Sequence, residues 1–253
     1  KKIFLGDGNA FGLKTEKLYE ILDLIAYYFP ECEGINMDAT VTSILHKSQE
    51  ELEMLARKKV KHLYLGIESG LDDVLKFMKK DHDLAQAYQA IDRLHEAGLI
   101  YDAHIMTGVA GKGRGMENAE ALAQFLNRTN PAHVVNFSMF LHKEVPLYQD
   151  IRQGTFVPAD ELETIREEYH LIERIAPEKA GANILYDGFH DFIHVRVRGH
   201  LPGDKEKMLA KLNGIIQEYE GKEPVYSFVQ GECPDLEYCD DGKAVWDMDR
   251  KTS

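Results

Sequence analysis

The sequence predicts an α/β fold in which parallel strands alternate with helices. Short apolar runs are each followed by apolar residues at helical spacing, and this strand–helix unit recurs about every 30 residues, as a βαβ construction requires. Glycine and polar residues follow the apolar runs, where the loops of a parallel barrel or open sheet form ligand sites. The expected strand centres are Ile3, Asn36, Tyr64, His104 and Asn136.

The clearest strand–helix unit covers residues 61–80, KHLYLGIESGLDDVLKFMKK. Its apolar and aromatic run at residues 62–67 suits a buried parallel strand, and the turn at Ser69-Gly70 ends that strand before a helical pattern begins. Glu68 therefore lies at the carboxyl end of a strand, which is the end that faces the ligand in parallel α/β folds. A carboxylate that only caps the following helix is the alternative interpretation of Glu68.

Two units precede this one. Residues 1–5 predict a strand that leads into a loop at residues 6–9, whose glycines allow backbone amides to approach a ligand closely. A helical face follows, and residues 34–40 predict the second strand. Ser48 and Glu51 fit a capping box, so we expect the next helix to begin at Ser48.

Two further strands follow the central unit. Residues 84–97 predict a helix, and residues 100–107 predict a strand that leads into a second glycine loop at residues 108–113. Residues 116–126 predict another helix, and residues 133–140 predict the fifth strand. The carboxyl ends of parallel strands meet at one edge of a sheet, so the polar residues that end these strands form one candidate site. These residues are Asp7, Asn9, Asp38, Thr40, Glu68, Ser69, Thr107, Ser138 and His142.

The pattern changes in the second half of the chain. We divide the chain into a partial barrel at residues 1–175 and a C-terminal α+β extension at residues 176–253. The helices that follow Pro146 are expected to cover the open side of the barrel. Residues 190–198 alternate between polar and apolar side chains, which predicts a strand with one buried face. The other helices expected here are residues 147–153, 160–175 and 203–220.

Composition and charge limit the classes of function. A chain of 253 residues with 44% hydrophobic content can bury one large core. A net charge of −13 disfavours nucleic-acid binding through a broad basic surface, although a local groove of Lys and Arg stays open because a sum does not reveal it. Three cysteines, without a signal peptide or a run long enough to span a bilayer, predict a cytoplasmic protein with no membrane partner.

Three loops in order resemble those of the radical S-adenosylmethionine (radical SAM) enzymes: LGDGN at residues 5–9, LGIESG at residues 65–70, and the glycine loop after residues 105–108. The similarity covers residues 1–175. It is greatest to the branch that contains the Elongator catalytic subunit, the methylthiotransferases and the oxygen-independent coproporphyrinogen oxidases. The resemblance implies a partial TIM-like (β/α)6 barrel that holds a [4Fe-4S] cluster and S-adenosylmethionine at the carboxyl ends of its strands.

The resemblance also implies a reaction and its partners. A reduced cluster would cleave S-adenosylmethionine to a 5′-deoxyadenosyl radical, which would abstract hydrogen from a substrate that the sequence does not identify. The electron donor would be a protein such as flavodoxin or ferredoxin. We therefore expect an enzyme, an oxidoreductase or a transferase.

The resemblance implies eight cofactor-binding residues and identifies no catalytic residue. Glu68 would reach the cofactor, Lys80 would face its carboxylate, and His104 lies near the position that contacts the ribose, where other members place an Asp. Gly108 would let its strand pass under the adenosine, and the loop of residues 6–9 would contact the methionine amino group. The full set is Gly6, Asp7, Gly8, Asn9, Glu68, Lys80, His104 and Gly108.

The sequence departs from the family in one respect that governs its chemistry: the CxxxCxxC loop that ligates three irons is absent. In the family this loop follows the first strand, so we expect a barrel that lacks its first βα unit, with the cluster ligands upstream of Lys1. Two alternatives stay open. One is a cluster-free barrel that binds a nucleotide-like ligand or a partner, and the other is a barrel whose glycine loops bind phosphate.

No residue is assigned to a metal. Cys32 is expected at the amino end of a strand, away from the cofactor loops, and Cys233 and Cys239 lie in an acidic tail with five residues between them, a spacing that fits no zinc pairing. Three histidines in the C-terminal part lack a matching carboxylate or cysteine spacing, so we expect them to be surface or core-edge residues. They are His190, His194 and His200.

Overall fold

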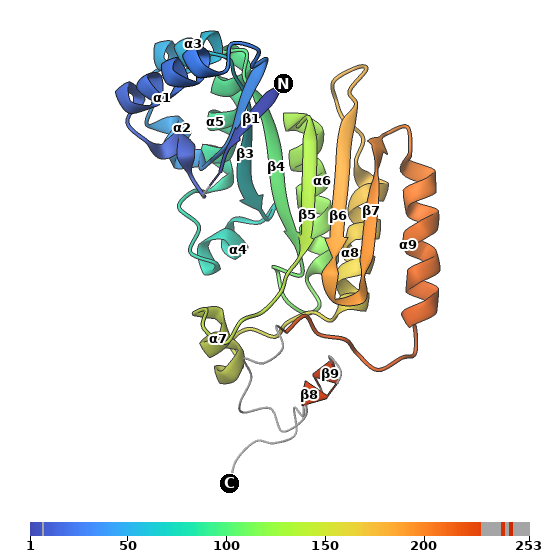
Figure 1. Ribbon diagram of the computed structural model, residues 1–253. Coiled ribbons are helices and arrows are strands. Elements are labelled where there is room, and N and C mark those ends of the chain that lie inside the picture. Colours follow the sequence, from blue (N-terminus) through green and yellow to red (C-terminus); the bar gives the residue numbers. More distant parts are fainter. Residues whose placement is uncertain (7, 229–238, 241–242, 245–253) are drawn as a thin grey trace.

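A computed structural model describes residues 1–6, 8–228, 239–240 and 243–244. Its centre is a seven-stranded sheet whose strands follow one another in sequence order (Figure 1). The first six strands are parallel, and the seventh is antiparallel to the sixth. The strands are β1 (Lys2–Leu5), β2 (Gly34–Ala39), β3 (Val60–Glu68), β4 (Ile100–Thr107), β5 (His133–Ser138), β6 (Ile184–His190) and β7 (Val195–Leu201).

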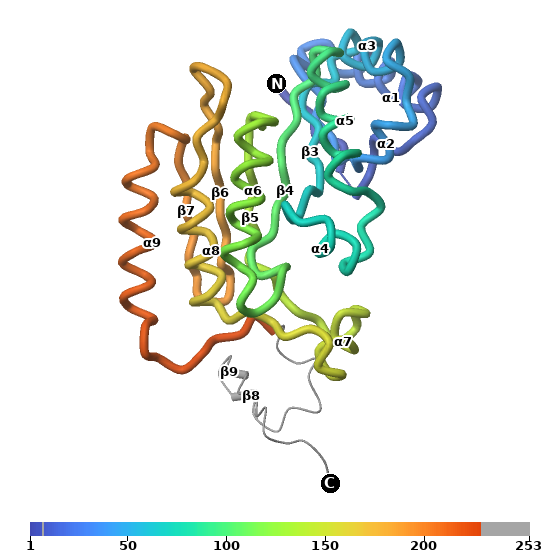
Figure 2. Tube along the Cα trace, turned by 180° about the vertical axis from the view of Figure 1, so that it is seen from behind, coloured from blue at the N-terminus to red at the C-terminus, as the bar shows by residue number. Residues whose placement is uncertain are grey.

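Helices line one face of this sheet. Among them, α5, α6 and α8 lie behind the sheet in Figure 1 and in front of it in Figure 2. The carboxyl ends of the parallel strands point toward α4 and α7 (Figure 1). In the described part of the chain, no helix is long and apolar enough to cross a membrane. The helices are α1 (Thr15–Tyr28), α2 (Val41–Leu45), α3 (Gln49–Arg57), α4 (Asp72–Phe77), α5 (Leu84–Glu96), α6 (Gly115–Thr129), α7 (Leu147–Gln153), α8 (Glu161–Arg174) and α9 (Lys205–Tyr219).

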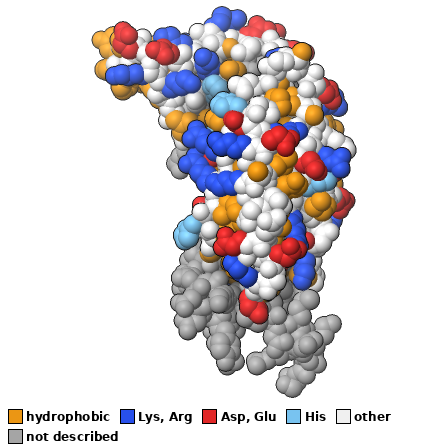
Figure 3. Space-filling model, turned by 90° about the vertical axis from the view of Figure 1, so that its right-hand side faces the viewer, with side chains coloured by type: hydrophobic (Ala, Val, Ile, Leu, Met, Phe, Trp, Pro, Cys, Tyr) orange, Lys and Arg blue, Asp and Glu red, His pale blue; other side chains and the backbone are white. Residues whose placement is uncertain are grey.

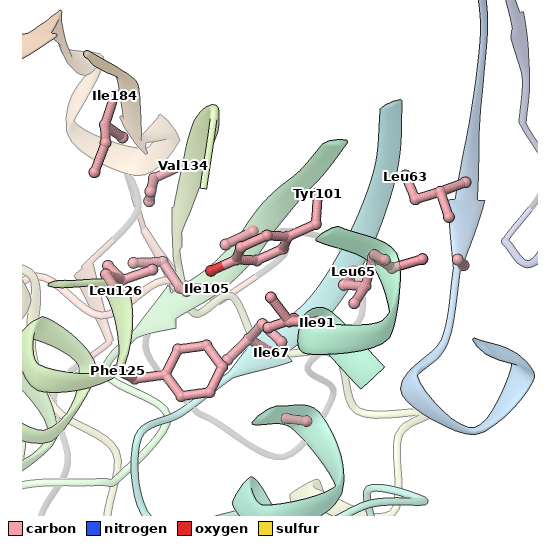
Figure 4. Packing of buried hydrophobic residues seen from close by; sticks show 14 of the residues in the cluster. Leu63, Leu65, Ile67, Ile91, Tyr101, Ile105, Phe125, Leu126, Val134 and Ile184 are labelled. Carbon is pink, nitrogen blue, oxygen red and sulfur yellow. The ribbon is translucent and has the colours of Figure 1, made fainter. Parts of the chain in front are cut away.

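The core lies between the sheet and its helices. In β3 the buried residues Leu63, Leu65 and Ile67 alternate with half-buried residues on the other face, as the two-residue period of a strand requires. Figure 4 shows these side chains in one layer with Ile91 of α5 and Phe125 of α6. Burial of this apolar layer is the main favourable contribution to folding.

The two edges of the sheet are not joined to each other among the described residues. The strand order begins at β1 and ends at β7, so the sheet is open and forms a partial barrel. The β1 edge is exposed, with Phe4 53% accessible. Beside it, the carboxyl-terminal part of α1 exposes Leu24, Tyr27 and Tyr28, followed by Phe29.

The predicted α/β class is confirmed, as are the five predicted strands. The expected start of α3 is also confirmed, because Ser48 Oγ accepts the Glu51 N–H at 3.2 Å and Glu51 Oε2 accepts the Ser48 N–H at 2.6 Å. Both hydrogen bonds satisfy amides that a helix start leaves without an intrahelical partner.

The single strand expected at residues 190–198 is wrong. β6 ends at His190, a short 3-10 turn follows at Asp191–Ile193, and His194 adopts a left-handed conformation that reverses the chain into β7. The sequence did not predict β6 as a strand because its burial pattern shows no simple alternation between buried and exposed residues. The sheet continues across residue 176, and the proposed division of the chain there stays a prediction.

We predict that Leu65→Ala lowers the free energy of unfolding by about 2–5 kcal/mol, because it leaves a cavity in the layer between the sheet and the helices. Urea denaturation followed by circular dichroism measures this change. Leu24→Ala is the control, since Leu24 is 57% exposed on α1 and its loss should change stability by less than about 0.5 kcal/mol. Equal effects of the two substitutions would contradict the assigned core.

Candidate functional site

Glu68 ends β3 in a conformation that turns its carboxylate over the sheet. Its φ of 62° is left-handed, and the register of β3 with β4 shifts between Gly66 and Glu68. Such a bulge redirects a side chain at a strand end. A Cβ atom at Gly66 would lie 2.5 Å from Glu68 Oε1, so only glycine leaves room for the carboxylate there.

Lys80 meets Glu68 although twelve residues separate them in sequence. A continuous helix of that length would hold the two residues about 18 Å apart. Instead α4 ends at Phe77, and Lys79 adopts a left-handed conformation, with φ of 56°, that turns the chain back. Lys80 Nζ then donates to Glu68 Oε1 at 3.2 Å, with both side chains about a quarter exposed.

A chain of polar contacts connects the loop after β1 to the segment that carries Lys80. Asn9 Nδ2 donates to Thr40 Oγ1 at 3.5 Å, and the hydroxyls of Thr40 and Thr42 lie 3.1 Å apart. Thr42 in turn donates to the Asp81 carboxylate. Burial raises the pKa of Asp81, but hydrogen bonds from Thr42 and His82 outweigh it and leave the pKa below its usual value.

The glycines of the first loop, Gly6 and Gly8, contribute only backbone atoms. Gly8 is left-handed, with φ of 89°, and a Cβ atom there would meet nothing within 4 Å. Gly6 packs against the ring of Phe4, whose nearest atom would be 3.3 Å from an added Cβ. Asp7 lies outside the described residues. Asn9, Thr40 and Thr42 also line a polar cavity of about 330 Å³.

His104 lies on the same face of the sheet as Gly66, its register partner on β3. Its ring packs between the rings of Tyr64 and Phe137, at centroid distances of 5.4 and 6.1 Å. Burial lowers the pKa of His104 and outweighs the nearby carboxylates, of which Glu68 raises it most. A neutral imidazole can both donate and accept a hydrogen bond, which suits a hydroxyl-bearing ligand.

Gly108 directly follows β4 in a left-handed conformation, with φ of 83°. An added Cβ would lie 2.8 Å from Thr164 Cγ2, so the close approach of α8 requires glycine. The amides of the loop are used within the protein: Gly108 N donates to Glu167, and Lys112 N donates to the Val157 carbonyl. Gly111 N and Gly113 N are also hydrogen-bonded, so these four amides are not available to a phosphate.

Some polar residues at the strand ends face the helices, which differs from the expectation of one polar edge. Ser69, Thr107 and Ser138 are buried, and none has more than 7% of its surface exposed. Ser69 Oγ donates to Asn118 of α6, and Ser138 Oγ donates to Glu161 of α8. Strand residues alternate between faces, so a polar residue at a strand end has two directions open to it.

A buried charged cluster behind the sheet was not predicted. His190 is completely buried, with Nδ1 3.0 Å from Glu161 Oε2 and Nε2 3.0 Å from Glu168 Oε2. Burial lowers the pKa of His190, but Glu168 and Glu161 raise it to about 10. Burial raises the pKa of Glu161, but the hydrogen bond and charge of His190 bring it below its usual value. The cluster is therefore an imidazolium between two carboxylates.

The surface or core-edge position expected for His190 is wrong, whereas His194 and His200 are exposed as expected. A sequence signal for the buried cluster exists in α8. Glu161 and Glu168 are seven residues apart and therefore share the helix face that carries the buried Ile165 and Ile172. Carboxylates on an apolar face indicate buried partners.

A local group of basic side chains lies on β7. Arg196 and Arg198 are about half exposed, and both pair with Asp187 of β6, at 2.6 and 3.5 Å. Figure 3 shows Lys and Arg side chains gathered on the side of the molecule that β7 and α9 form. Because both guanidinium groups pair with the same carboxylate, the groove of Lys and Arg that the net charge left open stays a prediction.

The described residues do not provide the ligands of an iron–sulfur cluster. Cys32 is buried just before β2, at the amino end of the sheet, and its Sγ lies 3.4 Å from the Gly34 carbonyl. Cys233 and the side chain of Cys239 lie outside the described residues. Within the described ranges, no group of three or more His, Cys, Asp or Glu could hold a metal ion.

Comparison with known proteins gives sequence matches that cover from about half to about two thirds of this chain. Residues 1–126 match the Radical SAM superfamily. The chain is 25% identical over 119 residues to a tRNA uridine(34) acetyltransferase of Methanocaldococcus infernus, a match that covers 47% of this chain and 22% of that protein. It is 22% identical over 174 residues to the heme chaperone HemW of Bacillus subtilis, covering 68% of this chain and 45% of HemW. The matches thus span less than half the length of either relative.

The fold has a counterpart among solved structures. The archaeal Elp3 of Methanocaldococcus infernus, with residues 1–46 deleted, superposes with a TM-score of 0.61 and 17% sequence identity. The superposition covers 86% of this chain and 54% of that one. At this identity the likeness concerns the fold alone.

We predict that stability depends on pH through His190. Its folded pKa of about 10 exceeds its ordinary value of 6.5, so its contribution to the free energy of unfolding is complete below about pH 6.5 and is lost as pH rises toward 10. His190→Leu should cost about 3–5 kcal/mol at pH 7, because two buried carboxylates lose their cation. Urea denaturation at pH 7, 8.5 and 10 measures both effects.

The control is His200→Leu, since His200 is exposed on β7. It should leave the decline of stability between pH 7 and 10 unchanged. If His190→Leu keeps the same decline as the wild type, the imidazolium assignment is incorrect.

Proposed function

We propose that this chain, which belongs to the radical SAM superfamily through residues 1–126, binds S-adenosylmethionine at the carboxyl end of its sheet and forms part of a radical SAM enzyme. The site would be the mouth between the ends of β1 to β4. Its proposed cofactor-binding residues are those that the sequence predicted, with Glu68 and Lys80 at its centre.

The contact between Glu68 and Lys80 is the observation that supports this proposal most directly. The amino acid end of S-adenosylmethionine carries an ammonium and a carboxylate, and Glu68 and Lys80 carry the complementary charges 3.2 Å apart. Among the described residues, Glu68 Oε2 and two of the three Nζ donors of Lys80 have no partner. The pair can therefore bind both charged groups of the ligand while it stays intact.

The polarity of this mouth also fits the cofactor. The neutral His104 lies on the same face of the sheet as Gly66, where it can donate to or accept from a ribose hydroxyl. Tyr64 and Phe137 flank that ring and provide an apolar and aromatic wall.

A [4Fe-4S] cluster would supply the electron that cleaves S-adenosylmethionine, with a donor such as flavodoxin or ferredoxin. This chain's own residues would bind the cofactor, orient it and exclude water. An unidentified substrate and a cytoplasmic location belong to the same proposal. The named activities of the tRNA acetyltransferase and the heme chaperone are not transferred, because the matches span 22% and 45% of those proteins.

We predict that the chain binds S-adenosylmethionine in isothermal titration calorimetry and that Glu68→Gln raises the dissociation constant about tenfold, since it removes one charge-assisted hydrogen bond. Lys80→Met should have an effect of similar size, and the double variant should lose less than the sum of the two. Lys76→Ala, an exposed change on α4, should leave binding unchanged. An unchanged constant in Glu68→Gln removes Glu68 from the site.

The enzyme proposal is tested with the complete gene product, reconstituted anaerobically with iron and sulfide and then reduced. We expect conversion of S-adenosylmethionine to 5′-deoxyadenosine, measured by liquid chromatography. Residues 1–253 treated in the same way should give no product and no absorbance shoulder at about 400 nm, where thiolate-to-iron charge transfer occurs. A complete product that contains the cysteine loop yet forms no 5′-deoxyadenosine rejects the enzyme proposal. A brown preparation of residues 1–253 would instead show that the tail supplies cluster ligands.

A further inference from the structure

A buried polar relay lies behind the proposed cofactor site, between α6 and α8. Glu167 of α8 and Asn118 of α6 are at most 1% exposed. Asn118 Nδ2 donates to Glu167 Oε1 at 2.7 Å. The pair lies on the helix side of the sheet and takes no part in the mouth where the ligand is expected.

Each end of this relay holds a different loop. Glu167 Oε2 accepts the backbone N–H of Gly108, which follows β4, at 2.8 Å. Asn118 Oδ1 accepts the Ser69 hydroxyl at 2.6 Å and the Gly70 N–H at 3.2 Å, both after β3. The loops that end two neighbouring strands are thus joined by two side chains.

The packing around the relay leaves the loops little freedom. A Cβ atom at Gly70 would lie 2.4 Å from the backbone nitrogen of Leu122 in α6. One at Gly115, the first residue of α6, would lie 2.9 Å from Glu167 Oε2. The first distance shows that α6 packs against the backbone of the loop after β3, and the second shows that Glu167 packs against the start of α6. A shift of the loop after β3 must therefore move α6.

From these contacts we propose that Glu167 and Asn118 are positioning residues, which hold the loop after β3 and the loop after β4 at the separation that S-adenosylmethionine binding requires. This inference rests on the proposed function. Glu68 precedes Ser69 directly, so an error in the position of Ser69 and Gly70 displaces the carboxylate that would bind the ligand. His104 lies on β4, four residues before Gly108. An error in the position of Gly108 therefore displaces the imidazole relative to Glu68.

The donors and acceptors at the two ends of the relay fix the orientation of the Asn118 amide. The Gly70 N–H is a backbone donor, so the Asn118 oxygen must face it and the Asn118 amino group must face Glu167. Glu167 in turn receives donors on both oxygens. A carboxylate at position 167 satisfies both, whereas an amide there places one N–H group against another donor.

This orientation allows a test by exchange of the two side chains. In Glu167→Gln, an N–H group of the new amide faces another N–H donor. In Asn118→Asp, two carboxyl groups face each other. Each single change therefore breaks the relay. The double variant Glu167→Gln with Asn118→Asp restores it, because the introduced carboxylate accepts from Ser69, Gly70 and the introduced amide, while the oxygen of that amide accepts from Gly108. Glu173→Gln, an exposed change on the same helix α8, is the matched control.

Two measurements are made on all variants. Hydrogen–deuterium exchange without ligand reports on the amides of Gly70 and Gly108, and calorimetry with S-adenosylmethionine reports on binding. We expect each single variant to speed exchange at both loops and to weaken binding about tenfold. The double variant should return exchange and affinity to within about threefold of the wild type, although it carries both changes.

The outcomes separate this inference from the proposed function. If the double variant binds no better than the single variants, or if Glu167→Gln leaves both loops as protected as in the control, the positioning role is rejected. If the wild type does not bind S-adenosylmethionine, the proposed function fails, while exchange still shows whether the relay sets the loops. Should a single variant fail to fold, recovery of folding and binding by the double variant still tests complementarity.

Discussion

The carboxylates that α8 buries against the sheet are the constraint on which the carboxyl end of this structure depends. Glu161, Glu167 and Glu168 are each at most 1% exposed, and burial raises the pKa of Glu167 to about 7. A buried carboxyl group is tolerated only when its oxygens are hydrogen-bonded. The donors come from β5, from β6 through His190, and from the loop after β4 through Gly108. The strand ends are therefore fixed by directional bonds as well as by apolar packing, and the mouth that faces away from α8 inherits that rigidity.

Much of the fold follows from local patterns in the sequence. The buried strands β3 and β4 and the amphipathic helices between them show periods of two and of about 3.6 that one chain segment can reveal without its neighbours. The strand β6 could not be found in this way, because Tyr186, Asp187 and Gly188 are all buried and the strand lacks the alternation of a half-buried strand. The error at residues 190–198 has the same origin, since a hairpin through His194 continues the polar and apolar alternation across a reversal of direction.

The residues of the candidate site were likewise predicted only in part from the sequence. Glu68 and Lys80 were predicted from loop motifs, and the short α4 with the turn at Lys79 brings their side chains together. Glu167 and His190 were missed because their partners come from elements 49 and 22 residues away and because most glutamates on a helix are exposed. The position of a polar group in the interior is decided by tertiary partners, which one sequence without its fold does not name.

The exposed edge at β1 has a consequence for handling the protein. A strand at the end of a parallel sheet presents unpaired backbone donors and acceptors, and here the apolar residues Leu24, Tyr27 and Phe29 lie beside it on α1 and just after it. An extended segment of another chain can add to such an edge, and apolar neighbours favour its retention. This edge therefore favours association of the protein at high concentration. Charged substitutions on the edge are the rational means of keeping a preparation monodisperse.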